Sequence, residues 1–197
     1  MAAPWIAARA KAASTFRIAL AGGSTPRPVY ERLSGLDLDW ASWHVWWSDE
    51  RLVPPDHPDS NEGMAREALL GRVAIPEEQI HPLRSTEVGL PERFDLVLLG
   101  IGPDGHTASL YPGDPALEAS EPIAYVERPG LPPDHPRLTF TYPIINAARV
   151  AAFLVGDGEK LEIAQRVLAG DESLPAARVR AEQTVMLADA ATAENAR

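Results

Sequence analysis

A histidine and an aspartate lie two residues apart in a glycine-rich segment, Gly-Ile-Gly-Pro-Asp-Gly-His-Thr-Ala-Ser, at residues 100–109. A neutral imidazole accepts a proton near pH 7, so His106 is a candidate general base. Asp104 can orient that imidazole, or it can hydrogen-bond to its own backbone in the turn. A purely structural alternative also fits, with glycines that only turn the chain and His106 as a polar residue at a helix start.

A second glycine-rich segment, Gly22-Gly23-Ser24-Thr25-Pro26, follows the short apolar run at residues 17–21. Glycine permits positive φ and close backbone approach, and proline at this point favours a helix start. Backbone N–H groups, the hydroxyls of Ser24 and Thr25 and a helix N-terminus together suit a phosphate group. The alternative is an ordinary strand-to-helix turn that one of the two hydroxyls caps.

Three charged residues, Asp49, Glu50 and Arg51, follow the apolar residues 45–47 after a single serine, Ser48. Charged side chains are seldom buried, so such a run at the end of a strand indicates either a solvated loop or a site. Residues 52–60 contain three prolines and are expected to form an irregular loop before the next helix.

Apolar runs alternate with helical patterns along the chain. That order is typical of an α/β fold with a mostly parallel sheet covered by helices. The carboxyl ends of parallel strands meet at one edge, so the polar loops that follow them can converge on one crevice. The expected strands are residues 17–21, 45–47, 94–99, 123–126, 138–141, 150–155 and 184–187, and the expected helices lie near 2–13, 26–33, 61–69, 143–148 and 159–168.

The composition predicts one globular domain, residues 1–197, with 45% hydrophobic and 23% charged residues. The 28 acidic and 18 basic side chains give a net charge of −10, which argues against a nucleic-acid partner. A small phosphorylated ligand stays compatible, because a few cations can make a local positive pocket. Apolar runs are too short to span a bilayer, so no membrane partner is expected. Without cysteine or an evident secretory signal, the chain is expected to be cytoplasmic.

The pentapeptide Pro-Pro-Asp-His-Pro occurs at residues 54–58 and again at 132–136. The flanking residues differ, so we interpret the recurrence as coincidence in two proline-rich loops. His57, His135 and neighbouring aspartates could in principle ligate a metal, but no pair has the helical or hairpin spacing typical of zinc sites. The sequence therefore predicts no metal site.

Four motifs, taken in order, resemble those of the 6-phosphogluconolactonases, which belong with the glucosamine-6-phosphate isomerases. The resemblance covers residues 17–187. It implies a three-layer, mostly parallel Rossmann-like sheet with helices on both faces, similar to the folds of glucosamine-6-phosphate deaminase, ribose-5-phosphate isomerase and CoA-transferase. The motifs are Ala21–Pro26, Ser48–Arg51 with Val53–Asn61, Gly100–Ser109, and Phe153–Val155 leading to Glu159 and Lys160.

The resemblance implies hydrolysis of 6-phospho-D-glucono-1,5-lactone to 6-phosphogluconate, in the oxidative pentose phosphate pathway. A lactone carbonyl is already activated, so the reaction needs a base, an oxyanion partner and a grip on the phosphate, with no cofactor and no metal. The expected partner is the small phosphorylated sugar lactone. The protein itself is expected to be a monomer or a weak homodimer.

In this interpretation His106 is the general base, Asp104 its possible orienter, and backbone N–H groups of residues 102–107 stabilise the oxyanion. Arg51, Lys160 and Arg137 are candidate cations for the phosphate, or else surface ion-pair partners. The expected substrate-binding residues are Gly23, Ser24, Thr25, Asp49, Arg51, Gly105, Thr107, Arg137 and Lys160.

Two other functions stay open. Deaminases of the family carry Ile-Ala-Phe-Asn-Glu-Pro after the histidine, whereas this chain has Thr-Ala-Ser-Leu-Tyr-Pro at residues 107–112. The glutamate that deaminases use in proton transfer thus has no counterpart here, and Arg51 stands where they carry tyrosine. A phosphosugar-sensing domain without catalysis is the other alternative, against which the intact His106 and Asp104 argue.

The chain is shorter than the proteins it resembles before the first strand and between Leu83 and Phe94. A missing helix would expose apolar sheet surface. We therefore expect either that other elements pack there or that a second subunit covers it.

Overall fold

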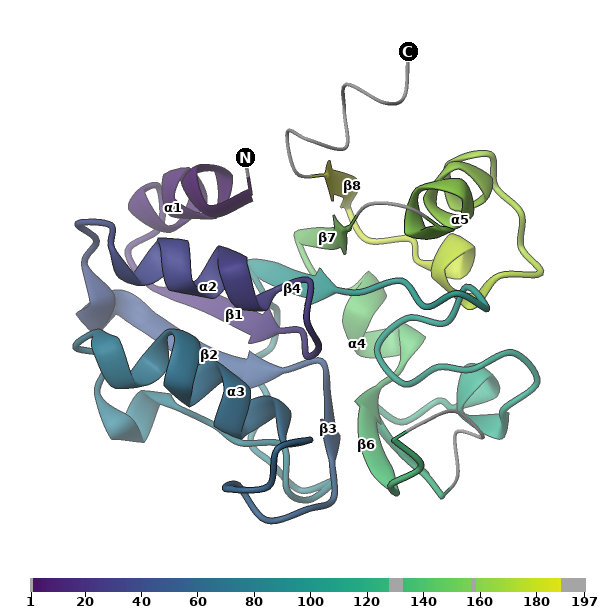
Figure 1. Ribbon diagram of the computed structural model, residues 1–197, viewed down its shortest axis with the longest axis horizontal. Coiled ribbons are helices and arrows are strands. Elements are labelled where there is room, and N and C mark those ends of the chain that lie inside the picture. The colour runs from purple at the N-terminus through teal and green to yellow at the C-terminus, as the bar shows by residue number, and fades with distance from the viewer. Residues whose placement is uncertain (1, 128–132, 157–158, 189–197) are drawn as a thin grey trace.

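The computed structural model describes residues 2–127, 133–156 and 159–188, so Pro132 of the second proline-rich pentapeptide lies outside the described part. Two sheets form the frame (Figure 1). The larger is parallel, with strand order β2-β1-β4-β7-β8, and the smaller is antiparallel, with order β3-β6-β5. The strands are β1 (Phe16–Leu20), β2 (Trp43–Trp47), β3 (Asp49–Arg51), β4 (Leu96–Leu99), β5 (Ile123–Val126), β6 (Arg137–Phe140), β7 (Val150–Val155) and β8 (Gln183–Ala188).

The central strands of the parallel sheet are buried along nearly their whole length. Every residue of β4 and β7 is buried, and so are four of the five residues of β1. Continuous apolar runs of this kind are what a parallel strand covered on both faces requires. The predicted α/β class with a mostly parallel sheet is confirmed, and β4, which leads into His106, lies at the centre of the sheet.

The helices begin and end at residues that suit those positions. Pro28 stands in the first turn of α2, and Gly35 follows its last residue. The Ser60 hydroxyl accepts a hydrogen bond from the Gly63 N–H at 3.0 Å and caps α3. The α-helices are α1 (Ala2–Lys11), α2 (Arg27–Ser34), α3 (Asn61–Ala68), α4 (Tyr142–Asn146) and α5 (Glu159–Leu168). Short 3-10 helices lie at Trp40–Ser42, Leu70–Arg72, Glu77–Gln79, Pro115–Glu118 and Pro175–Arg178.

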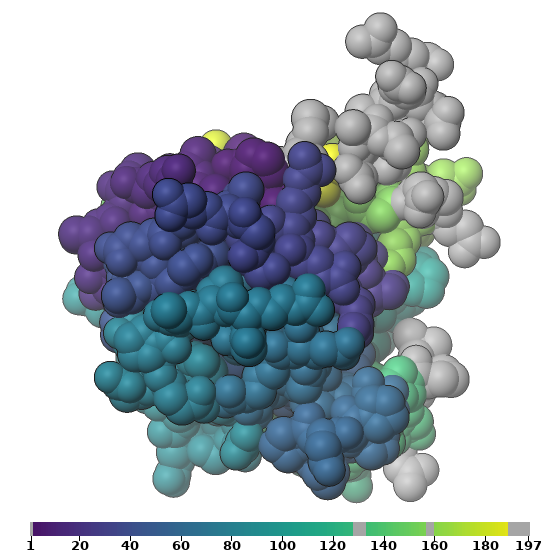
Figure 2. All heavy atoms as spheres, turned by 60° about the vertical axis from the view of Figure 1, so that its left-hand side comes forward, coloured from purple at the N-terminus to yellow at the C-terminus, as the bar shows by residue number. Residues whose placement is uncertain are grey.

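Helices α2 and α3 lie side by side in front of β1 and β2, and α1 lies next to α2 (Figure 1). With the left-hand side of Figure 1 turned forward, the purple, blue and teal residues make one continuous face (Figure 2). Helix α5 packs against β7 at the other end of the sheet. None of the helices in the described residues is long and apolar enough to cross a membrane.

The charged run at residues 49–51 is not a solvated loop, the first of the two alternatives considered for it. It forms β3, in which Asp49 and Glu50 are buried. Ser48 makes the change of sheet: its N–H donates to Leu20 of the parallel sheet at 2.8 Å, and its carbonyl accepts from Phe140 of the antiparallel sheet at 2.7 Å. The run thus continues as an edge strand of the second sheet.

Irregular chain packs over β2 where a cover helix was expected to be missing. Trp46 stacks on His81, with ring centroids 4.2 Å apart, and its indole N–H donates to the carbonyl of Gly89 at 2.9 Å. Phe94 meets the same indole edge-on at 5.3 Å. Trp46 is only 5% exposed as a result, so the first of the two expected outcomes, packing by other elements, is confirmed at this face.

Candidate active site

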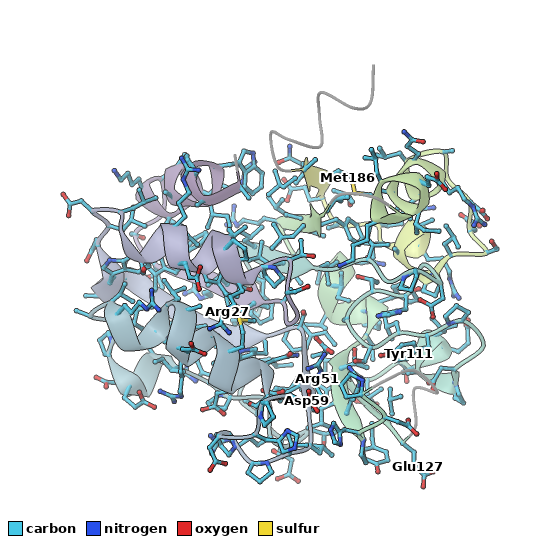
Figure 3. The ribbon with its side chains drawn as sticks, viewed as in Figure 1. Arg27, Arg51, Asp59, Tyr111, Glu127 and Met186 are labelled. Carbon is cyan, nitrogen blue, oxygen red and sulfur yellow. The ribbon has the colours of Figure 1, made fainter. Side chains whose placement is uncertain are left out.

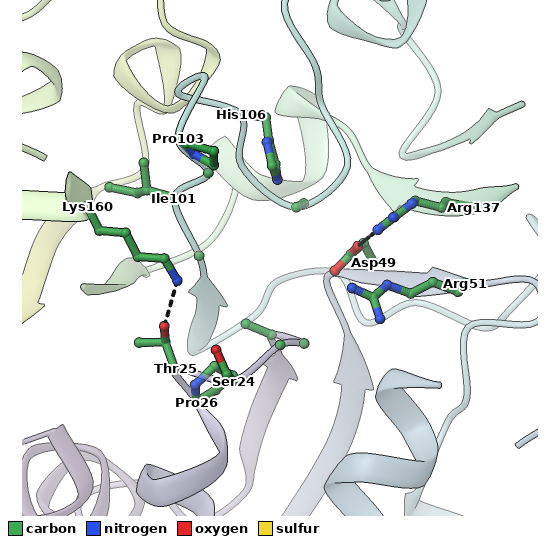
Figure 4. Close-up of a pocket in the computed structure, with 16 residues that line it drawn as sticks. Ser24, Thr25, Pro26, Asp49, Arg51, Ile101, Pro103, His106, Arg137 and Lys160 are labelled. Atoms are coloured by element: carbon green, nitrogen blue, oxygen red, sulfur yellow. Dashed lines mark hydrogen bonds and ion pairs between the residues drawn. The ribbon is translucent and has the colours of Figure 1, made fainter. Parts of the chain in front are cut away.

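A cavity of about 240 Å³ lies at the carboxyl ends of the central parallel strands (Figure 4). Loops that follow β1 and β4 reach it, together with β3, β6 and α5. Eight of the predicted site residues line it: Gly23, Ser24, Thr25, Asp49, Arg51, His106, Arg137 and Lys160. The convergence expected from the sheet geometry therefore occurs.

Asp104 grips His106 in two ways. Its Oδ1 lies 2.5 Å from the ring Nδ1 and accepts the His106 backbone N–H at 3.2 Å. Both roles considered for Asp104, orienting the ring and bonding the turn backbone, are thus present together. Because a carboxylate accepts from Nδ1–H, the other ring nitrogen, Nε2, keeps the lone pair that a general base needs.

The electrostatics of this pair favour an ionised Asp104. Burial by itself raises the pKa of that carboxyl, but the hydrogen bond and charge of His106 outweigh it and hold the pKa below its ordinary value. The side chains of Asp104 and His106 are 31% and 21% exposed. Most of each side chain is therefore shielded from solvent, and the exposed part lets water reach the pair.

Gly102 is required by the position of the imidazole. A Cβ on Gly102 would lie 2.1 Å from the His106 ring, which no side chain can satisfy. The Gly102 N–H donates to the His106 carbonyl at 2.9 Å, and the Gly105 N–H donates to the Gly102 carbonyl at 3.0 Å. The glycine-rich loop therefore folds back on itself around the histidine.

Gly105 and Thr107 are not in the cavity lining, although both were expected to contact substrate. Gly105 has φ +80°, which favours glycine, and its carbonyl accepts from Ala176 at 3.0 Å. Thr107 is fully buried, and its hydroxyl donates to the carbonyl of Gly100 at 2.9 Å. Both residues shape the loop that presents His106.

Ala108 lies between two anchored residues in a strained conformation. Its φ of 47° is in the left-handed region, which costs a non-glycine residue roughly 1–2 kcal/mol. Thr107 holds one side of it through Gly100, and Ser109 holds the other through its hydroxyl, which donates to Asp49 Oδ2 at 2.7 Å. Ala108 lines the cavity, a place that its residue type alone does not indicate.

Asp49 is a buried hub that joins three segments of the cavity wall. Besides Ser109, its carboxylate accepts from Asn61 Nδ2 at 3.3 Å and pairs with Arg137 Nη1 at 3.9 Å. Asn61 also donates to the Asp49 carbonyl at 2.8 Å and lies so close to Gly22 that a Cβ there would meet its side chain at 1.9 Å. Asp49 therefore positions other groups, together with Asn61.

Arg51 and Arg137 face each other across the antiparallel sheet. They are register partners of β3 and β6, where like charges directly opposite are unfavourable. Arg51 Nη1 donates to the Asp59 carbonyl at 2.6 Å, and Arg137 Nη2 donates to the Pro133 carbonyl at 2.7 Å. In the part of the chain that the structure describes, the Nε of each is buried without a hydrogen-bond partner. Two guanidinium groups directly opposite each other at one cavity concentrate positive charge there, which is the chemistry that attracts an anion.

The opposite wall carries the glycine-rich cradle and Lys160. Lys160 Nζ donates to the Thr25 hydroxyl at 2.9 Å, which ties α5 to the loop after β1 (Figure 4). Ser24 lies beside Thr25 in the same lining. The cavity thus has cations on both sides, with His106 between them.

Glu50, the middle residue of the charged run, serves the helix rather than the cavity. Its carboxylate accepts the backbone N–H groups of Arg51, Asn61 and Glu62 at 2.7, 2.8 and 2.6 Å. Two of these belong to the start of α3, where N–H groups lack helical partners. Burial raises the pKa of Glu50, although these hydrogen bonds act in the opposite direction.

The comparisons with known proteins agree with this geometry. The family model described as glucosamine-6-phosphate isomerases/6-phosphogluconolactonase matches residues 2–187. The chain belongs to this family. A 6-phosphogluconolactonase from Synechocystis is 40% identical over 205 residues, which cover 91% of this chain and 84% of that protein. A second, from Nostoc, is 43% identical over 175 residues, 78% of this chain and 72% of that protein.

Solved structures show the same fold. The 6-phosphogluconolactonase from Thermotoga maritima has a TM-score of 0.85 and 31% identity, and the match covers 95% of this chain and 93% of that one. A monomeric glucosamine-6-phosphate deaminase has a TM-score of 0.78 but only 19% identity, over 98% of this chain and 93% of that one. The deaminase shares the fold, whereas the lactonases share fold and sequence, so the predicted resemblance is confirmed.

Proposed function

We propose that the protein hydrolyses 6-phospho-D-glucono-1,5-lactone to 6-phospho-D-gluconate. The observation that carries the proposal is the position of the His106–Asp104 pair beside the same cavity as the facing pair Arg51 and Arg137. One pair supplies a base and the other a double cation for a phosphate. The relatives named 6-phosphogluconolactonase support this choice of substrate.

His106 Nε2 takes a proton from water as the water oxygen attacks the lactone carbonyl carbon. The tetrahedral intermediate then collapses and breaks the bond between that carbon and the ring oxygen, which receives the proton back from the imidazolium. Asp104 stabilises the imidazolium while it exists. The products are the opened hydroxyl and a carboxylic acid that ionises in water.

Backbone N–H groups stabilise the oxyanion, and the contacts within the loop narrow the candidates. Three N–H groups of residues 102–107 donate within the loop, those of Gly102, Gly105 and His106. Pro103 has none, and Thr107 is paired with Leu110 in an isolated β-bridge. We assign the oxyanion contact to the N–H group of Asp104.

We place the phosphate between Arg51 and Arg137, because both line the cavity and an anion there relieves the repulsion between like charges directly opposite each other. Ser24, Thr25 and Lys160 on the opposite wall then hold the sugar hydroxyls or the new carboxylate. Asp49 keeps Arg137 in place from behind.

The test is acid release from freshly prepared 6-phospho-glucono-lactone, followed at constant pH and corrected for spontaneous hydrolysis. A rate that rises in proportion to protein and disappears on His106→Ala supports the proposal. Binding of the phosphosugar without added hydrolysis would instead indicate a sensor, and ammonia release from glucosamine-6-phosphate would indicate a deaminase. Either result overturns the proposal.

We further propose that the protein acts in the cytoplasm as a monomer or a weak homodimer. Light scattering across a tenfold range of protein concentration tests the second statement. A mass that stays at that of a tetramer would overturn it.

A further inference from the structure

Two histidines and an aspartate from distant parts of the chain meet outside the catalytic cavity. His57 and Asp59 lie in the loop after β3, and His135 lies just before β6. One ligand atom from each, an imidazole nitrogen or a carboxylate oxygen, lies within 4.8 Å of the other two. The spacing along the sequence argued against such a group, but the pairing of β3 with β6 brings the two loops together.

The distances are close to those that a small metal ion imposes. His135 Nε2 lies 2.9 Å from Asp59 Oδ2, and His57 Nδ1 lies 3.8 Å from the same oxygen. The two imidazole rings meet edge-on, with centroids 5.3 Å apart. A tetrahedral zinc ion with ligand bonds of about 2.0–2.1 Å separates its ligand atoms by about 3.3 Å, which lies between the two distances.

We propose that His57, Asp59 and His135 bind a divalent transition-metal ion of the zinc class. Two imidazoles and one carboxylate select Zn²⁺, Ni²⁺ or Cu²⁺ over Mg²⁺ and Ca²⁺, which prefer oxygen ligands. The three side chains are 31–36% exposed, so water can complete the coordination. The proposal does not depend on the lactonase assignment.

The backbone around the three ligands is held by short turns. The His57 N–H donates to the Pro54 carbonyl at 2.9 Å, and the His135 N–H donates to the Pro133 carbonyl at 3.0 Å. Each histidine is followed by a proline, whose fixed φ limits the loop further. The ion displaces two contacts, the Asp59 N–H that donates to His57 Nδ1 at 3.1 Å and the hydrogen bond between His135 Nε2 and Asp59 Oδ2.

The cluster of His57, Asp59 and His135 is connected to the catalytic cavity through Arg51. Figure 3 shows Arg51 and Asp59 next to each other, and Arg51 Nη1 donates to the Asp59 carbonyl. His57 and Asp59 line a neighbouring cavity of about 530 Å³ that also contains Ser24 and Arg51. An ion that fixes Asp59 therefore also restrains Arg51, which lines the catalytic cavity.

The experiment is calorimetric titration of chelator-stripped protein with ZnCl₂ alone, and with MgCl₂ as the comparison ion. We expect one zinc per chain in the wild type and at least a 10-fold weaker affinity in His135→Ala and in Asp59→Asn. The matched control is His44→Ala. His44 belongs to the other histidine pair, stacked on His81 at 5.8 Å, and its loss leaves zinc affinity unchanged.

A second readout keeps the proposal testable if a variant folds poorly. Co²⁺ bound to the wild type gives the intense visible absorption of a four-coordinate site, and one equivalent of Zn²⁺ removes it. Wild-type protein without stoichiometric zinc binding would overturn the proposal. Equal affinity in the wild type and in both ligand variants, or a loss in His44→Ala as large as in His135→Ala, would overturn it as well.

Discussion

The loop after β4 contains Asp104, which holds the cavity-lining His106, and β3 contains Asp49, which lines the cavity itself; the two aspartates have opposite surroundings. Asp104 keeps about a third of its side chain exposed and contacts one other residue, His106. Asp49 is buried and contacts Ser109, Asn61 and Arg137. Asp104 contacts an imidazole, a group that can gain and lose a proton. Asp49 contacts groups that keep one charge state and one position.

This difference follows from the cost of charge in a protein interior. A base that gains and loses a proton in each turnover needs water nearby, because an uncompensated buried charge is very unfavourable. A carboxylate that only positions neighbours gains from burial, because its interactions are stronger away from water. The comparison predicts that the first region controls rate and the second controls stability.

The largest expected effect is on turnover. His106→Ala removes the base, and kcat should fall by about 10²- to 10⁴-fold while the thermal unfolding curve stays close to that of the wild type. Initial rates of acid release and circular dichroism on the same preparations check this. Near-normal kcat in a folded variant would remove His106 from the role of base.

The next effect should fall on stability. Asp49→Ala leaves Arg137 without its carboxylate and should lower the free energy of unfolding by about 3 kcal/mol or more. Asp104→Ala is the matched control, because it also deletes an aspartate that holds a cavity residue but should change stability by less than about 1 kcal/mol.

Urea denaturation of both variants measures the difference. The two-region comparison fails if Asp104→Ala is the more destabilising change. Asp49→Asn keeps an acceptor for the Ser109 hydroxyl. If it restores part of the free energy of unfolding lost in Asp49→Ala, the stabilising role of Asp49 is divided between this hydrogen bond and the carboxylate charge.

Arg51→Ala should raise the KM for the phosphorylated lactone by about 10-fold, since it removes one of two cations from the anion site. The unphosphorylated lactone should react as it does with the wild type. Arg149→Ala, which removes an arginine with 62% of its side chain exposed, should leave KM unchanged. Equal losses on both lactones would argue against a phosphate contact for Arg51.

The smallest expected effect is a pH-dependent one at Glu50. Because burial raises the pKa of Glu50 in the folded state, the native protein binds more protons than the unfolded chain between the ordinary value of 4.5 and the raised one. The contribution of Glu50 to stability is therefore full below that interval and declines as pH rises through it.

Glu50→Gln should lower the free energy of unfolding at pH 7 by about 1 kcal/mol, because one acceptor for the start of α3 is lost. The gap between wild type and variant should widen as the pH is lowered toward 5. Urea unfolding at four pH values measures this gap, and a gap that narrows on acidification would contradict the assigned direction of the pKa.

The sequence determined the parts of this protein that depend on neighbouring residues. The apolar runs of β4 and β7 and the helical pattern at residues 159–168 are local, and each appears in the structure where the sequence predicted it. The pairing of Asp104 with His106 is also local, because a two-residue spacing in a tight turn leaves the carboxylate near the ring. The family follows from these local motifs, since four of them in order are far more specific than one.

Only the tertiary structure decided which distant residues face each other. Arg51 meets Arg137, and His57 meets His135, because the chain leaves the parallel sheet at Ser48 and continues as β3, which pairs with β6. The charged run itself predicted a loop or a site. In the structure Asp49 positions its neighbours, Glu50 accepts N–H groups at the start of α3, and Arg51 lines the cavity. Strand register is set by packing over the whole fold, so no local pattern in either segment could reveal these pairs.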